Sequence, residues 1–101
     1  MKYGLSDTAI AKIIDIFKSD PNVHEAIIYG SRALGNYREG SDIDITLKGE
    51  LTFNNILRLE GKLDNQMLPY RIDLSSFEKI KNRDLIEHIN RVGKVLYRKH
   101  G

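Results

Sequence analysis

The stretch IIYGSRALGNYREGSDIDITLKG, residues 27–49, holds the pattern that decides the fold. An apolar run stops at Gly30-Ser31, and after a polar loop a second run alternates between apolar and polar residues, as a half-buried strand does. Asp42 and Asp44 fall on the same face of this strand, where two carboxylates repel each other and satisfy no packing need. We therefore expect a cation to lie between them.

The composition is that of an ordinary globular protein. The 101 residues are 41% hydrophobic and 30% charged, so we expect one domain over residues 1–101 with a modest core. No apolar run approaches the ~20 residues of a membrane-spanning helix, and the N-terminus lacks a signal pattern, so we expect a cytoplasmic protein. The chain has no cysteine, so any metal must be held mainly by oxygen.

Turn residues and hydrophobic periodicity predict alternating helices and strands. Pro21 and Pro69 each stand just before a strand candidate, and Ser6 and Thr52 can each cap a helix. The expected helices are 6–19, 31–35, 52–68 and 82–92, and the expected strands are 23–29, 41–49, 71–75 and 95–97. This order predicts an α/β or α+β domain in which helices cover one mixed sheet.

The Gly30-Ser31 corner is a candidate phosphate site. A strand that ends in glycine and turns into a short helix directs backbone N–H groups and a serine hydroxyl at one place, which suits phosphate. Gly-Ser is also a common turn pair, and on its own an ordinary turn explains it more simply.

The aspartates give a more specific signal. Residues two apart on a strand lie about 6.5 to 7 Å apart, so Asp42 and Asp44 can lean onto one or two divalent ions. Two magnesium ions about 3.5 to 4 Å apart suit in-line displacement at phosphorus. Asp73, on the polar face of the strand at 71–75, would be a third ligand if the two strands are neighbours. A bare Asp-x-Asp is more often a loop cap and an exposed residue, but the upstream Gly-Ser and the third strand aspartate favour a metal site.

The segments GSRALG (30–35), SDIDI (41–45) and RIDL (71–74) together resemble the nucleotidyltransferase superfamily of DNA polymerase beta type. Because the match fills the chain, it is similar to the minimal nucleotidyltransferases, the group of the MntA-type antitoxins. The resemblance implies that the metal ligands and catalytic carboxylates are Asp42, Asp44 and Asp73, and that the nucleotide is bound by Gly30, Ser31 and Arg32. In that likeness Asp73 could also help to deprotonate the attacking hydroxyl, and Arg32 would lie near the phosphates or the partner surface.

The same resemblance implies an enzyme that uses ATP and two Mg²⁺ ions. It would transfer AMP to a hydroxyl, a tyrosine of a HEPN-domain toxin, and so act as the antitoxin of a type VII toxin–antitoxin pair. The implied partners are a nucleoside triphosphate and the toxin, in a hetero-oligomer, with neither a membrane nor nucleic acid as partner.

Two alternatives remain open. Family members often carry a second arginine where this chain has Leu34, so the protein could instead be a weak or inactive nucleotide-binding subunit that inhibits its partner by complex formation only. The basic balance also allows a nucleic-acid-binding module, but a net charge of +2 is too small to argue for one. His24, His88 and His100 share no ligand-like spacing, and we expect structural or surface roles for them.

Overall fold

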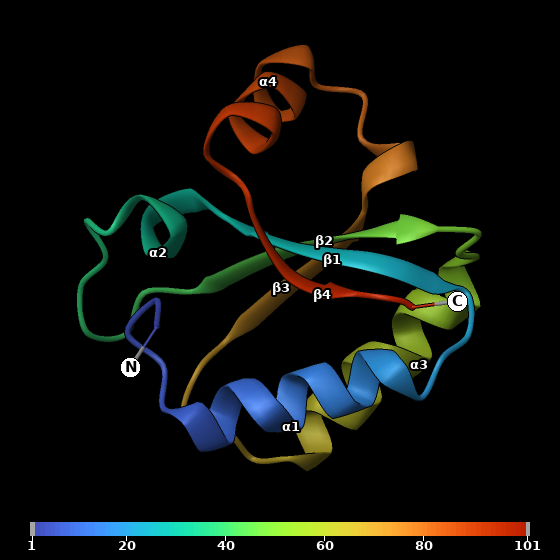
Figure 1. Ribbon diagram of the computed structural model, residues 1–101, viewed down its shortest axis with the longest axis horizontal. Helices are drawn as coiled ribbons and strands as arrows, with labels where there is room; N and C mark the ends of the chain where they lie inside the picture. The colour runs from blue at the N-terminus through green and yellow to red at the C-terminus, as the bar shows by residue number, and fades with distance from the viewer. Residues whose placement is uncertain (1, 101) are drawn as a thin grey trace.

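A computed structural model describes residues 2–100 as a four-stranded sheet with helices on both faces (Figure 1). The elements in chain order are α1 (Asp7–Lys18), β1 (Val23–Tyr29), α2 (Gly30–Leu34), β2 (Ile43–Gly49), α3 (Phe53–Asn65), β3 (Ile72–Ser76), a 3₁₀ turn η1 (Phe77–Lys79), α4 (Arg83–Val92) and β4 (Lys94–Arg98). This order confirms the predicted alternation. Strand β2 begins at Ile43, so Asp42 lies just outside the strand that was expected to contain it.

Helix caps explain where the longer helices begin. The Ser6 side chain accepts a hydrogen bond from the Ala9 N–H, and Asn82 accepts from the first turn of α4. Thr52 and Asn55 form a capping box at the start of α3. Loss of such a cap costs about 1 kcal/mol, so these polar residues stabilise the helix starts that the sequence predicted. None of the helices within residues 2–100 has the length and apolar character needed to cross a bilayer.

The sheet is mixed, as predicted, with strand order β3-β2-β1-β4. Strand β1 pairs antiparallel with β2 and with β4, whereas β2 and β3 run parallel and are joined through α3. A parallel pair needs a crossover of this kind, which a hairpin cannot provide. In the resulting register Asp44 lies opposite Tyr29 on one side and Asp73 on the other. The condition that the two aspartate-bearing strands are neighbours is therefore met.

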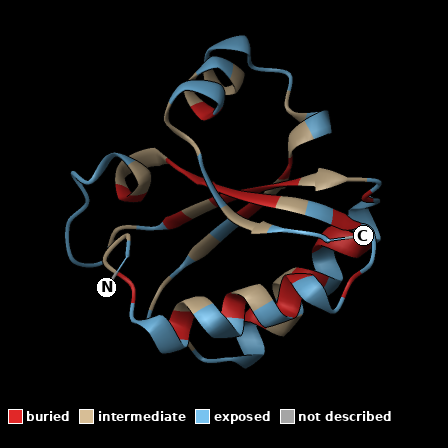
Figure 2. Cartoon of the chain, in the orientation of Figure 1, coloured by how far each residue is buried: buried red, intermediate tan, exposed pale blue. Residues whose placement is uncertain are grey.

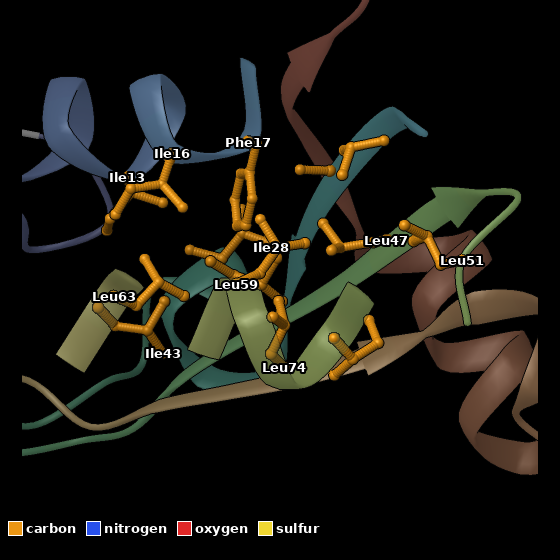
Figure 3. Close-up of a cluster of buried hydrophobic side chains, with 14 of the residues drawn as sticks. Ile13, Ile16, Phe17, Ile28, Ile43, Leu47, Leu51, Leu59, Leu63 and Leu74 are labelled. Carbon is orange, nitrogen blue, oxygen red and sulfur yellow. The ribbon is translucent and has the colours of Figure 1, made fainter. Parts of the chain in front are cut away.

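The two faces of the sheet are packed differently. Helices α1 and α3 cover one face, where Phe17 and Leu59 meet strand residues such as Ile28 in the main core (Figure 3). Helix α4 lies on the opposite side of the sheet (Figures 1 and 2). Its residue Ile89 packs on Ile27 and Tyr29 in a smaller cluster. Full burial of a side chain such as Phe17 contributes about 1.5–3 kcal/mol, so the α1–α3 side holds most of the stabilising apolar surface. Asp44 and Asp73 lie on the face of the sheet that α4 covers.

Candidate active site

The candidate site lies at one edge of the sheet, where β1 ends and both β2 and β3 begin. Asp44 and Asp73 are in register on neighbouring strands, so their side chains project to the same face. That face also carries Tyr29, on the side of the sheet packed by α4. Strand order and register thus place two of the predicted carboxylates beside the end of β1.

The chain turns sharply at Gly30, the first residue of α2. Gly30 has a φ of +74°, a conformation that costs about 1–2 kcal/mol for a residue with a Cβ. A Cβ at this position would also collide with Oδ2 of Asp44. The glycine therefore serves two purposes: it allows the turn, and it lets the Asp44 carboxylate lie against the backbone. Ser31 follows it and is partly exposed.

The electrostatic environment of Asp44 is unfavourable for a lone carboxylate. Burial, then the negative charges of Asp73 and Asp42, raise the pKa of Asp44, and His88 acts in the opposite direction. The pKa of the Tyr29 hydroxyl is raised as well, first by burial and then by Asp44 and Asp73, against a side-chain hydrogen bond with Ser75. The site therefore concentrates negative charge, which a cation would relieve.

Oxygen donors of this kind fit a hard divalent cation. Asp42 and Asp73 are exposed and Asp44 is partly buried, so all three can reach solvent. Carboxylates are preferred ligands of Mg²⁺, which keeps several waters and needs only one or two protein carboxylates beside substrate phosphates. As the side chains stand, no group of three or more acidic, histidine or cysteine side chains in residues 2–100 forms a complete metal cage. The residues therefore suit an ion shared with a nucleotide, and the metal ligands remain a prediction.

His88 belongs to this site although its spacing in the sequence gave no sign of it. Its Nε2 accepts a hydrogen bond from the Gly30 N–H at 3.2 Å, and its ring meets Tyr29 edge-on with centroids 6.2 Å apart. In this bond Nε2 of His88 is the acceptor and the backbone N–H of Gly30 is the donor. These contacts agree with the expected structural role, but their position at the Gly30 corner depends on how α4 folds back over the end of β1.

Arg32 is buried, and its guanidinium bonds to backbone carbonyls. The residue is 3% exposed, and its guanidinium donates to the Ser41 carbonyl from Nε and Nη2 at 3.1 and 2.8 Å. Nη1 donates to the Tyr3 carbonyl at 2.9 Å. Its side chain is turned into the protein and its donors bond to backbone oxygens, and a contact of Arg32 with phosphate or a partner stays a prediction.

A cavity lies between α3 and the segment that leads into β3. It has a volume of about 310 Å³ and is lined by Asp73 and Tyr70, with residues from the C-terminal half of α3 on its other wall. Because α3 packs on the face of the sheet opposite to Asp44, this cavity lies beside the strand and not over the paired carboxylates.

Comparisons with known proteins agree with this architecture. The family model described as polymerase beta, nucleotidyltransferase, matches residues 11–100. A protein of Methanocaldococcus jannaschii, named as a candidate protein adenylyltransferase, is 30% identical over 100 residues, which cover 90% of this chain and 97% of the relative.

Solved structures share the fold. A chain of a toxin–antitoxin complex crystallised with AMP-PNP superposes with a TM-score of 0.73 at 24% identity, covering 89% of this chain and 73% of that chain. A chain of the complex between a tri-AMPylated HEPN toxin and an MNT antitoxin of Shewanella oneidensis gives a TM-score of 0.69 at 20% identity, covering 94% and 74%. With the family match over most of its length, the chain belongs to the polymerase beta nucleotidyltransferase family.

Proposed function

We propose that this nucleotidyltransferase is a Mg²⁺-dependent protein adenylyltransferase that moves AMP from ATP to a tyrosine hydroxyl of a HEPN-domain toxin. The observation that carries the proposal is the pairing of Asp44 with Asp73 across β2 and β3, beside the Gly30 corner. In this proposal residues 1–101 act as one nucleotidyltransferase domain.

Asp42, Asp44 and Asp73 are the residues that would hold the metal. Two bound Mg²⁺ ions would neutralise phosphate charge and favour attack at phosphorus. The raised pKa of Asp44 supports this assignment, because two neighbouring carboxylates are among its causes and a cation would offset their repulsion.

The side chains and backbone of the corner would orient the nucleotide. Gly30 and Ser31 would bind the triphosphate, since a glycine backbone and a serine hydroxyl allow close approach of phosphate oxygens. The tyrosine oxygen attacks the α-phosphorus, the bond to the pyrophosphate oxygen breaks, and pyrophosphate leaves. Asp73 is exposed and would accept the tyrosine proton.

The relatives of the chain support a protein acceptor. The relative from M. jannaschii is named for protein adenylyltransfer, and the structural neighbours come from toxin–antitoxin complexes. We accordingly propose that the protein acts in the cytoplasm as the antitoxin of a type VII pair and forms a hetero-oligomer with its toxin.

The test is transfer of label from α-labelled ATP to the HEPN-domain protein encoded next to this chain. The wild type with Mg²⁺ should label the partner, whereas Asp42→Asn and Asp44→Asn should not. Label that depends on neither aspartate would refute the proposed chemistry. A partner that is bound and inhibited without label would instead favour the inactive-subunit alternative. Leu34 supports this alternative, because an apolar side chain that is 54% exposed offers no charge to a phosphate.

A further inference from the structure

Arg32 connects three segments of the candidate site. It projects from α2, the helix that begins at the Gly30 corner, and two of its nitrogens donate to the carbonyl of Ser41, the residue before Asp42. Its third nitrogen holds the N-terminal turn through Tyr3. One buried side chain thus ties the corner to the segment that carries the first aspartate.

Aromatic rings complete the surroundings of the guanidinium. The Cζ atom of Arg32 lies 5.2 Å from the ring centroids of both Tyr37 and Tyr70. Tyr70 immediately precedes the segment Arg71–Asp73, and the Arg71 carbonyl accepts a hydrogen bond from the Ile43 N–H at 2.8 Å. Through Tyr70 the arginine therefore also contacts the segment of chain that leads into Asp73.

Asp42 lies just outside β2, and the Ile43 N–H bond to Arg71 holds the chain only on its C-terminal side. The turn before it is closed by the Ser41 N–H to the Arg38 carbonyl and by the Arg38 N–H to the Ser41 hydroxyl, at 3.0 and 2.8 Å. These bonds shape the turn but do not attach it to the rest of the site. The bonds from Arg32 to the Ser41 carbonyl make that attachment.

Within the described residues, Arg32 forms no ion pair, so its buried charge is met by carbonyl oxygens and ring faces alone. Lysine cannot replace this arrangement, because it has no planar fork that can donate in two directions while lying between two rings. We propose that Arg32 is a positioning residue that does not itself bind phosphate. It fixes the positions of Asp42 and of the chain segment before Asp73 relative to the Gly30-Ser31 corner. This inference rests on the proposed function, because the residues that it positions are the proposed metal ligands.

The test measures binding of Mn²⁺, as a probe for Mg²⁺, by the loss of the free-ion signal in electron paramagnetic resonance, with and without AMP-PNP. The Arg32→Lys variant should bind Mn²⁺ at least tenfold more weakly than wild type. Arg58→Lys, the same change at an exposed position of α3, should bind as wild type does. Equal Mn²⁺ affinity of Arg32→Lys and wild type, or a loss confined to AMP-PNP affinity, would overturn the positioning role. Absence of Mn²⁺ binding by wild type would overturn the proposed function and this inference together.

A second measurement needs no substitution. The Arg32 Nε–H of the wild-type protein should give a nuclear magnetic resonance signal that exchanges slowly with water and keeps its position when Mg²⁺ and AMP-PNP are added, because its acceptor is the Ser41 carbonyl. A signal that exchanges rapidly, or that moves strongly on nucleotide addition as a phosphate contact would cause, would overturn the inference even if Arg32→Lys fails to fold.

Discussion

The Asp44 carboxylate occupies the space that a side chain at residue 30 would need, so that only glycine allows both the turn and the aspartate. Gly30 also adopts a left-handed φ of +74°. The corner proposed to bind phosphate and the carboxylate proposed to bind metal are therefore fitted to each other, and neither can change alone.

Gly30→Ala should destabilise the protein by about 1–3 kcal/mol and abolish transfer, because the new methyl group displaces Asp44 and strains the backbone. Urea unfolding and the labelling assay measure the two effects. Gly61→Ala is the matched control, since Gly61 lies inside α3 with open space around it, and it should stabilise the protein by about 0.4–1 kcal/mol. Wild-type activity of Gly30→Ala would contradict the conclusion that residue 30 and the Asp44 carboxylate compete for the same space.

The pH dependence of stability follows from Asp44. Burial and the charges of Asp73 and Asp42 raise its pKa, so the ionised form is less favourable in the folded state than in the unfolded chain. That cost is full above the folded pKa and absent below the unfolded value of about 4.

In metal-free buffer Asp44→Asn should therefore unfold at higher urea concentration than wild type at neutral pH. The difference should shrink as the pH falls through the raised pKa. Saturating Mg²⁺ should stabilise wild type more than the variant, because only wild type keeps the full set of carboxylates. An asparagine variant that is less stable than wild type at neutral pH without metal would show that the carboxylate charge is already compensated.

His88 should act through its bond to the Gly30 N–H. His88→Gln retains an acceptor of similar reach, whereas His88→Ala leaves the amide without this partner at a cost of about 1–3 kcal/mol. We expect His88→Ala to lose stability and to raise the KM for ATP, and His88→Gln to restore part of both. If the two variants behave alike in unfolding and in kinetics, the hydrogen bond does not matter.

Ser31→Ala tests the phosphate assignment. Loss of a hydrogen bond to a charged group costs about 1.5–3 kcal/mol, so the KM for ATP should rise by roughly tenfold or more. The melting temperature should change little, because Ser31 is partly exposed and donates no side-chain bond in the part of the chain described. A large drop in melting temperature with an unchanged KM would assign the serine to the fold instead.

Much of the fold is predictable from local sequence, since local pattern encodes which face of a strand is buried. Alternation of apolar and polar residues predicts β2, and the capping residues Ser6 and Thr52 predict helix starts that the structure confirms. Strand order is a different matter. The sequence alone does not show that the strands carrying Asp44 and Asp73 are neighbours. That pairing depends on how α3 returns the chain to the sheet.

The site is less predictable for the same reason. His88 reaches Gly30 from α4, and nothing in the spacing of the histidines indicates this contact. Arg32 directly follows the Gly-Ser pair. At this position the sequence does not distinguish an arginine that binds phosphate from one that is buried and bonds to the backbone. The distinction depends on Tyr3 and Tyr70, which lie far from it in the chain and close to it in space.

The most direct test of the central claim is a crystal structure of the protein with Mn²⁺ and AMP-PNP, in which anomalous scattering locates the metal. Our account predicts anomalous peaks between the triphosphate and the carboxylates of Asp42 and Asp44, with the phosphates against Gly30 and Ser31. Nucleotide and metal bound elsewhere, or phosphates bound at the corner with no metal on either aspartate, would contradict it.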